Sequence, residues 1–169
     1  MNQETLSPTR RSFFALCANA AVGALAWQLV GRTEGASAAA PAAFSLPDTE
    51  WRRRLSPAAN SVLRQSATER PFSSPLNDEH RRGTFVCAGC ALPLYASATK
   101  FDSGTGWPSF YDHLPHATGG SLDRSLGEQR EEVHCARCRG HLGHVFDDGP
   151  RPTGLRYCMN GVAMRFVPS

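Results

Sequence analysis

"CAGC" at residues 87–90 and "CARC" at residues 135–138 are two C-x-x-C pairs within one short chain. The tight turn of such a pair places both thiolates on the same side, so two pairs together offer four sulfur ligands to one ion. The four cysteines therefore predict a closed, tetrahedral structural zinc (Zn2+) site: Cys87, Cys90, Cys135 and Cys138. Such a site would join two distant parts of the chain and contribute to the folding free energy.

The start of the chain differs in composition from the rest. Of 169 residues, the first 38 carry "TRRSF" at 9–13, a moderately apolar run, and Ala36-Ser37-Ala38 as a candidate cleavage site. This pattern resembles a twin-arginine signal peptide. It predicts the twin-arginine export machinery as a partner and a periplasmic or exported location. If the signal is not cleaved, residues 12–31 are just long enough to anchor the protein in a membrane.

Residues 39–46 are rich in Ala and Pro and predict a linker, so residues 47–169 form the expected domain.

Two disulfide bonds are the alternative use of the paired cysteines, because an exported protein permits them. We favour zinc, since the twin-arginine route carries folded proteins and the metal could bind before the thiols reach an oxidising compartment.

Two short helices are expected at the start of this domain. Asp48 can cap "TEWRRRL", and Ser56-Pro57 is a cap and first-turn proline for "AANSVLRQ". The spacing of apolar residues places four of them inward: Trp51, Leu55, Val62 and Leu63.

Beyond Thr68 the apolar runs become short and rich in β-formers, with Gly, Pro, Asn and Asp between them. The expected strands are "GTFVCA", "LPLYAS", "SFYDHL", "EEVHCA", "LGHVFDD", "LRYCMN" and "AMRFVPS". The sequence therefore predicts a mainly β fold: two small antiparallel sheets with short N-terminal helices, clamped by the four-cysteine zinc site.

The charge pattern argues against nucleic acid. The net charge is +3, with 18 Lys and Arg interspersed among 15 Asp and Glu. Basic runs are short and no aromatic residues are interleaved with them. We expect no nucleic-acid partner, and a monomer.

Cys158 is left without a partner once the signal and the two pairs are set aside. In the strand "LRYCMN", Leu155, Tyr157 and Met159 share one face, and the other face is polar. That polar face holds Arg156, Cys158 and Asn160, so a positive charge and an amide flank the thiol. Because a thiolate is the nucleophilic form, this pattern indicates a reactive cysteine, with a buried structural cysteine as the alternative. The alternation stops at Gly161, which predicts a bulge.

His141 and His144 lie three residues apart in "HLGHVF", and histidine is the usual acid or base near neutral pH. The alternative is that they bind metal, although four cysteines already fill one zinc site. Trp107 lies in the glycine-rich stretch "DSGTGW", where its indole either packs internally or contacts a ligand. Together a thiol, two imidazoles and an indole would suit a small, sulfur-bearing group.

These segments, in this order, resemble the B-type methionine sulfoxide reductases, which act on the R epimer. The matching segments are "TERPF", "CAGC", "KFDSGTGWPSF", "CARC", "GHLGHVFDDGP", "PTGLRYCMN" and "MRF". The resemblance runs from about Asp48 to the C-terminus. It implies two antiparallel sheets, zinc held by four cysteines, Cys158 as nucleophile, and substrate-side roles for Trp107, His141, His144 and Asn160.

The resemblance also implies a substrate and a mechanism. Substrates would be oxidised proteins or peptides that contain methionine-R-sulfoxide. The Cys158 thiolate would attack the sulfoxide sulfur and become a sulfenic acid, while His141 or His144 protonates the oxygen. Trp107 would pack against the substrate methyl group. Arg156 would favour the thiolate, and Asn160 would orient the histidines or the oxygen.

One position departs from the family pattern. Many members carry a resolving cysteine in "SGCGW", whereas this chain has Thr105. It therefore resembles the one-cysteine variants, whose sulfenic acid is reduced by a thioredoxin-like domain or a small thiol. A zinc cysteine that leaves the metal is the alternative resolving group. The alternative function is a zinc-knuckle binding module in which Cys158 is structural.

Overall fold

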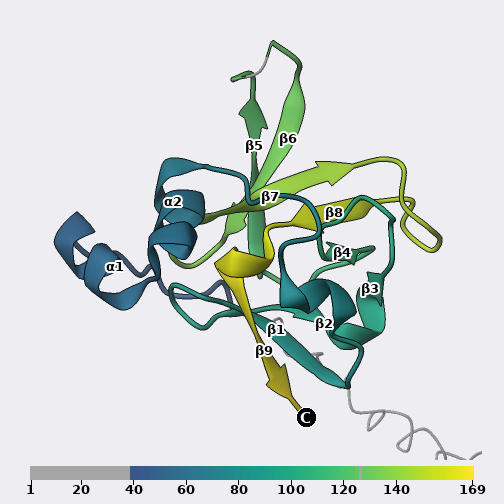
Figure 1. The fold of residues 1–169 in the computed structure, drawn as a ribbon, viewed down its shortest axis with the longest axis horizontal. Helices are drawn as coiled ribbons and strands as arrows, with labels where there is room; N and C mark the ends of the chain where they lie inside the picture. Colours follow the sequence, from purple (N-terminus) through teal and green to yellow (C-terminus); the bar gives the residue numbers. More distant parts are fainter. Residues whose placement is uncertain (1–38, 126) are drawn as a thin grey trace, which may run out of the picture. The chain divides into compact units, whose positions relative to one another are not determined.

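The computed structural model describes residues 39–125 and 127–169, which form two antiparallel sheets and two short helices (Figure 1). The segment assigned to the export signal, residues 1–38, lies outside the described residues. Within the described ranges, no helix has the length and apolar character needed to cross a membrane.

The helices follow the predicted amphipathic pattern. Helix α1 spans Asp48–Arg54 and α2 spans Pro57–Gln65, and all four apolar side chains predicted to face inward are buried. The Ser56 hydroxyl accepts a hydrogen bond from the Ala59 N–H at 3.1 Å, as expected of an N-cap. Asp48 is not a cap, because Pro47 occupies that position and Asp48 lies in the first turn, where its charge favours the helix N-terminus.

In the described residues nine strands form the two sheets, which confirms the predicted fold class. The first sheet has the order β2-β1-β9, from β1 (Gly83–Cys87), β2 (Pro93–Ala96) and β9 (Met164–Pro168). The second has the order β3-β4-β8-β7-β6-β5. Its strands are β3 (Lys100–Phe101), β4 (Ser109–Phe110), β5 (Thr118–Asp123), β6 (Arg130–Cys135), β7 (His141–Phe146) and β8 (Arg156–Met159).

Three short 3-10 helices complete the fold: η1 (Pro75–Asp78), η2 (Ser97–Thr99) and η3 (Gly161–Ala163). The predicted bulge at Gly161 is wrong, because the strand pattern ends there in η3.

Aromatic side chains join the two sheets. Tyr95 of β2 stacks on Phe110 of β4 with ring centroids 4.3 Å apart, and Phe85 of β1 meets the same ring edge-on at 4.9 Å. The Tyr95 hydroxyl donates to the Met159 sulfur of β8 at 3.0 Å. Because all four side chains are fully buried, this contact is part of the core.

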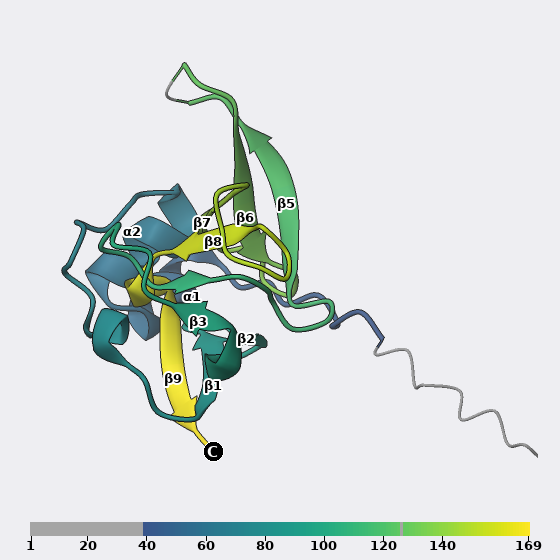
Figure 2. The same ribbon diagram turned by 90° about the vertical axis from the view of Figure 1, so that its right-hand side faces the viewer.

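Strands β5 and β6 extend away from the rest of the molecule as a long hairpin (Figures 1 and 2). The sequence did not predict β5, because "TGGSLD" has two glycines and no alternation of apolar residues. The strand exists because six residue pairs join it to β6 at the edge of the sheet.

The predicted linker, residues 39–46, is attached to the domain near its C-terminal end. The Phe44 N–H donates to the Arg137 carbonyl at 2.9 Å, and the Phe44 ring packs edge-on against Trp51.

Candidate functional site

The four paired cysteines lie together and have the geometry of a tetrahedral metal site. Their sulfur atoms all lie within 4.8 Å of one another, with Cys87 and Cys138 3.7 Å apart and Cys90 and Cys135 3.5 Å apart. A zinc–sulfur bond of about 2.3 Å implies tetrahedral sulfur–sulfur edges of about 3.8 Å. The residues present therefore fit a zinc ion.

The disulfide alternative is wrong for this structure. A disulfide requires sulfur atoms about 2.05 Å apart, and all five cysteines among the described residues are free. The sulfur–sulfur distances of 3.7 Å (Cys87–Cys138) and 3.5 Å (Cys90–Cys135) are both far longer than a disulfide bond.

Each C-x-x-C segment is the turn of a hairpin. The Ala91 N–H donates to the Cys87 carbonyl in the β1–β2 turn, and the Arg139 N–H donates to the Cys135 carbonyl in the β6–β7 turn, each at 2.9 Å. A bound ion would therefore connect β1 of the first sheet to β6 of the second. Helix α2 covers this site, and the Arg64 guanidinium donates to the Cys138 carbonyl at 3.0 Å.

Cys158 lies in β8, between β4 and β7. Its register partners are Ser109 in β4 and His144 in β7. Because directly opposite residues of an antiparallel pair point to the same face, these three side chains share one face of the sheet. Tyr157, opposite Phe110 and Val145, points to the other face, so the predicted alternation in this strand is confirmed.

The reverse face has its own open hollow of about 120 Å³, lined in part by Tyr157, Val145 and His113. Since Tyr157 and Val145 point away from Cys158, this hollow does not belong to the candidate site.

Arg156 precedes Cys158 on the same face and is itself held by Asp148. Its guanidinium donates two hydrogen bonds to the Asp148 carboxylate, at 2.8 and 2.9 Å. Burial raises the pKa of the Cys158 thiol, while the Thr105 hydroxyl and the Arg156 charge lower it. Burial prevails, so the pKa lies above that of an ordinary cysteine. The effect of Arg156 has the expected direction, because it lowers the pKa of the thiol.

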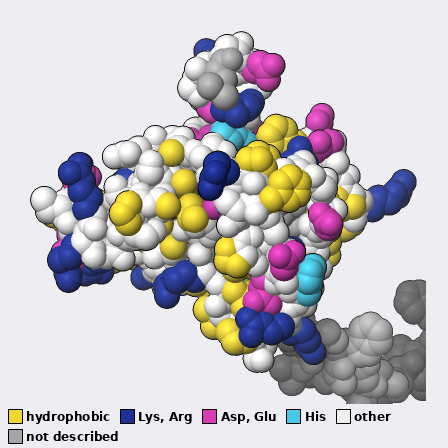
Figure 3. Space-filling view, in the orientation of Figure 1, with side chains coloured by type: hydrophobic (Ala, Val, Ile, Leu, Met, Phe, Trp, Pro, Cys, Tyr) yellow, Lys and Arg dark blue, Asp and Glu magenta, His cyan; other side chains and the backbone are white. Residues whose placement is uncertain are grey.

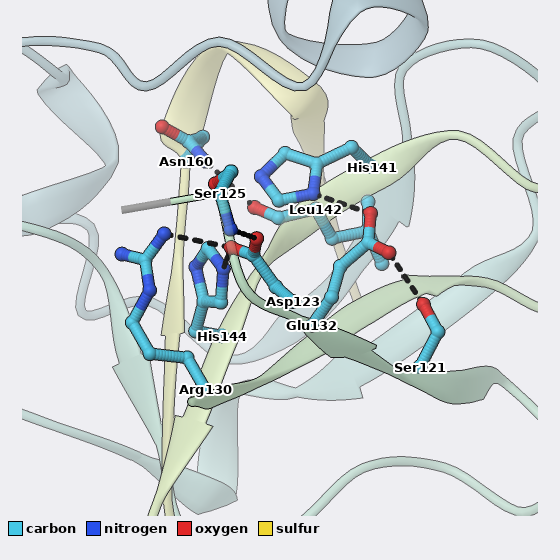
Figure 4. Close-up of polar contacts among 9 residues, drawn as sticks. All are labelled: Ser121, Asp123, Ser125, Arg130, Glu132, His141, Leu142, His144 and Asn160. Carbon is cyan, nitrogen blue, oxygen red and sulfur yellow. Dashed lines mark hydrogen bonds and ion pairs between the residues drawn. The ribbon is translucent and has the colours of Figure 1, made fainter. Parts of the chain in front are cut away.

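The two histidines of β7 each bind a carboxylate (Figure 4). His141 Nδ1 lies 2.7 Å from Glu132 of β6, and His144 Nε2 lies 2.8 Å from Asp123 of β5. The two imidazole centroids are 5.4 Å apart. His144 therefore lies opposite Cys158, and His141 lies beside His144.

Asp123 accepts hydrogen bonds from several sides. The Ser125 N–H, together with His144 and Arg130, holds the pKa of this carboxyl well below its usual range. Burial lowers the pKa of His144, against the opposing effect of Asp123, so its neutral form is favoured. For a neutral ring, the Nε2 proton then lies toward Asp123 and Nδ1 is a free base.

His141 is more deeply enclosed than His144. Its side chain is 4% exposed, and among the described residues its buried Nε2 has no hydrogen-bond partner. Burial raises the pKa of Glu132, but hydrogen bonds from Ser121 and His141 outweigh that effect and leave it lowered. Glu132 is therefore an ionised acceptor that orients His141.

Asn160 joins the histidine strand to a distant segment. Its side-chain amide donates to the Leu142 carbonyl at 3.0 Å, and its side-chain oxygen accepts from the Glu69 N–H at 2.9 Å. Trp107 Nε1 in turn donates to the Glu69 carbonyl at 3.1 Å. Asn160 thus connects the strand that carries the histidines with the segment that holds the indole.

The loop that carries Trp107 needs glycine for its close contacts. Gly106 has φ +90°, and a Cβ there would lie 2.8 Å from the backbone nitrogen of Phe72. The Phe72 N–H donates to the Gly106 carbonyl at 2.7 Å. In β7, a Cβ on Gly143 would lie 2.1 Å from the Cys158 carbonyl oxygen, so only glycine lets β7 approach β8 this closely.

Sequence reasoning missed the partners of the predicted residues: Glu69, Asp123 and Glu132. For Glu132 the sequence did hold a signal. The alternation of side chains in the predicted strand "EEVHCA" places Glu132 on the same strand face as His134. Asp123 had no signal, since β5 was not predicted.

Basic side chains are dispersed over the face drawn in Figure 3, with acidic side chains among them.

A family match and several similar proteins place the chain among known proteins. The SelR domain family matches residues 55–168. A protein of Bradyrhizobium diazoefficiens named peptide methionine sulfoxide reductase MsrB is 54% identical over 122 residues, which cover 72% of this chain and 88% of that protein. Proteins of the same name from Thiobacillus denitrificans and Leptospira interrogans are 50% and 47% identical, over 72% and 70% of this chain and 92% of each protein.

Proposed function

The chain belongs to the SelR-domain family and is a peptide-methionine (R)-S-oxide reductase, and we propose how its residues carry out that reaction. The reaction returns oxidised methionine to methionine and so repairs oxidised proteins. The observation that carries the proposal is the position of Cys158 directly opposite His144, whose imidazole is held by Asp123.

The first step is proton transfer from Cys158 to His144. The raised pKa of the thiol and the lowered pKa of the imidazole mean that both groups begin neutral. Residues opposite each other in an antiparallel pair have Cβ atoms about 5 Å apart, so the two side chains are neighbours. Asp123 stabilises the imidazolium that forms.

The second step transfers oxygen. The Cys158 thiolate attacks the sulfoxide sulfur, and His144 returns its proton to the sulfoxide oxygen. The oxygen ends on Cys158 as a sulfenic acid and methionine leaves as a thioether, so Cys158 is oxidised by two electrons and the substrate is reduced by two. Trp107 packs against the substrate methyl group, and Asn160 holds the strand that carries His141 and His144.

The third step requires an external thiol. Thr105 occupies the position of the family's resolving cysteine, so the mature chain acts as a one-cysteine variant. One thiol attacks the sulfenic acid with loss of water, and a second thiol releases Cys158 as the first becomes a disulfide. A thioredoxin-like protein or a small dithiol would supply these electrons.

The four-cysteine cluster is the proposed site of a structural zinc ion. The ion would hold the two hairpin turns together and leave no open coordination position, so it would supply stability only. All of the chemistry is assigned to the face of the sheet that carries Cys158.

We also propose that residues 1–38 are a twin-arginine signal and that the enzyme acts as a monomer in the periplasm. Replacing both Arg10 and Arg11 with lysine tests this: a folded fusion protein should accumulate inside the cell and be lost from the periplasmic fraction. Unchanged periplasmic recovery would reject the twin-arginine assignment.

The central test is a single turnover without reductant, with R and S epimers of a methionine sulfoxide peptide compared. Mass spectrometry should find one added oxygen on Cys158 after the R epimer, and no new disulfide. Cys158→Ser should abolish reduction. A new disulfide to a zinc cysteine, or turnover by Cys158→Ser, would contradict the scheme. The alternative of a binding module with a structural Cys158 has no support from the comparisons.

A further inference from the structure

Three hydroxyl groups connect the Cys158 sulfur to the backbone of Trp107. The Thr105 hydroxyl lies 3.9 Å from the Cys158 sulfur, and 2.8 Å from the Ser103 hydroxyl. The Ser103 hydroxyl lies 2.7 Å from that of Ser109, which donates to the Trp107 carbonyl at 3.1 Å. Ser109 is also the register partner of Cys158 in β4. The contacts therefore form one continuous path from the nucleophile to the Trp107 carbonyl.

The inner end of this path is sealed from water. Ser109 is 0% exposed, and among the described residues its hydroxyl contacts only the Ser103 hydroxyl and the Trp107 carbonyl. A buried hydroxyl without partners is costly, so its bonding must be satisfied within this path.

The number of protons fixes the direction of the path when Cys158 is a thiol. A carbonyl can only accept, so Ser109 donates to Trp107. Each hydroxyl has one proton, so Ser103 donates to Ser109 and Thr105 donates to Ser103. Thr105 is then left as an acceptor for the S–H of Cys158.

A thiolate requires the opposite direction. It can only accept, so Thr105 must donate to the sulfur, Ser103 to Thr105, and Ser109 to Ser103. Ser109 then no longer donates to the Trp107 carbonyl. The reversal needs only rotation of three hydroxyl protons, with every heavy atom in place.

We propose that Ser103, Thr105 and Ser109 form a reversible hydroxyl relay that donates a hydrogen bond to Cys158 when it ionises and releases the backbone of Trp107 at the same moment. The inference rests on the proposed role of Cys158 as nucleophile. Thr105 is a catalytic residue, because it touches the reacting sulfur, while Ser103 and Ser109 are positioning residues. Ionisation of the nucleophile is thereby linked to the loop that presents the indole to the substrate.

Other charged groups also face Cys158 and must stay constant in any test. Arg156 lies on its own strand, paired with Asp148, and His144 lies opposite on β7, paired with Asp123. On the side of β4 and the preceding loop, Asp102 is the acidic group, and its carboxylate accepts from the Gly104 N–H. None of these groups contacts the hydroxyls of the relay.

The test measures the pKa of Cys158 in the zinc-loaded protein, without sulfoxide or reductant. The rate of iodoacetamide alkylation is followed over a pH series by mass spectrometry of the peptide that contains Cys158. Thr105→Val keeps the side-chain shape and should raise this pKa by about one unit, since a hydrogen bond to a charged group is lost. Thr105→Ser should restore the wild-type value.

Ser109→Ala is the decisive variant, because the relay reaches Cys158 from Ser109 only through Ser103 and Thr105. It should raise the pKa of Cys158 in the same direction by a smaller amount. Ser103→Ala interrupts the same relay. It replaces Ser109→Ala in this test if Ser109→Ala does not fold. Thr84→Val, a matched change in the other sheet, should leave the pKa unchanged.

An unchanged pKa in Thr105→Val overturns the proposal. A shift in Thr105→Val alone, with none in the folded serine variants, overturns the relay as well, because Thr105 would then act without it. The measurement involves no turnover, so it is separate from the test of function: activity in Cys158→Ser would reject the nucleophile and leave the alkylation result intact.

Discussion

The side-chain amide of Asn160 donates to the Leu142 carbonyl at 3.0 Å, at a point in β7 between His141 and His144. The Asn160 backbone N–H donates to the same carbonyl at 2.8 Å. Together the two bonds fix the strand that carries both histidines, and the Asn160 side-chain oxygen extends this support to the segment at Glu69.

Replacing Asn160 with alanine should therefore reduce both stability and activity. The side chain is 3% exposed, so its removal leaves the Glu69 N–H without its partner, at a cost of about 1–3 kcal/mol in the free energy of unfolding. Urea denaturation measures this cost, and kcat/KM should fall in the same protein. Asn60→Ala is the control and should change neither, because the half-buried Asn60 of α2 makes no side-chain hydrogen bond with the described residues; equal loss in both variants would refute the role of Asn160.

Loss of the metal ion should weaken the connection between the two sheets and destabilise the protein. Cys87→Ser removes a ligand that is 0% exposed, so the protein should lose its bound zinc and its Tm should fall by several degrees. Elemental analysis and thermal denaturation check this together. Cys158→Ser is the matched control and should keep one zinc per chain, and a Cys87→Ser protein with full zinc content would exclude the assigned ligands.

The pH dependence of kcat/KM should have two limbs set by Cys158 and His144. The reactive form holds a neutral imidazole and a thiol, so activity falls on the acid side as His144 is protonated. Burial lowers that pKa, so this limb lies below the ordinary histidine value of about 6.5. On the alkaline side activity falls as the proton shared by Cys158 and His144 is lost. Because burial raises the pKa of Cys158, this limb lies above the ordinary cysteine pKa of about 8.5.

Asp123→Asn should move the acid limb to still lower pH. The Asp123 carboxylate raises the pKa of His144, so its removal lowers that pKa further. The same change should lower the maximal rate, because the imidazolium loses its anionic partner. If the acid limb instead moves to higher pH, the group that titrates there is not His144.

The sequence was sufficient for the elements whose residue pattern is local. The two C-x-x-C turns, the alternation around Cys158 and the burial of Trp51 and Leu63 all follow from short-range spacing. The partners of the histidines could not be predicted in the same way. Asp123 reaches His144 only because an edge strand with no apolar alternation pairs along β6, and that pairing depends on the rest of the sheet.

The hydroxyl relay was beyond sequence reasoning for a related reason. Ser103 and Ser109 are common residue types, and only the turn at Gly104 and Gly106 brings them into one line with Thr105. In the sequence, Thr105 was notable solely as a position without a cysteine.

Thr105→Cys should change how the catalytic cycle ends. The Thr105 hydroxyl lies 3.9 Å from the Cys158 sulfur, so a sulfur at that position needs to move by about 2 Å to reach disulfide distance. After one turnover without reductant, the variant should show a loss of two hydrogens in place of a gain of one oxygen. Mass spectrometry of the unreduced protein distinguishes these outcomes, and a persistent sulfenic acid would show that the loop holds the new sulfur away.

The positions of the four cysteines at two hairpin turns also influence which disulfide bonds form when the protein is oxidised. In the folded protein Cys87 lies 3.7 Å from Cys138 and Cys90 lies 3.5 Å from Cys135, so oxidation after metal loss should be able to form disulfide bonds that join one sheet to the other. In an unfolded chain the sulfurs nearest in sequence are those three positions apart within each C-x-x-C pair, and oxidation should close two small rings. The disulfide map of aged or stressed protein would thus tell whether the chain was folded when it lost its ion.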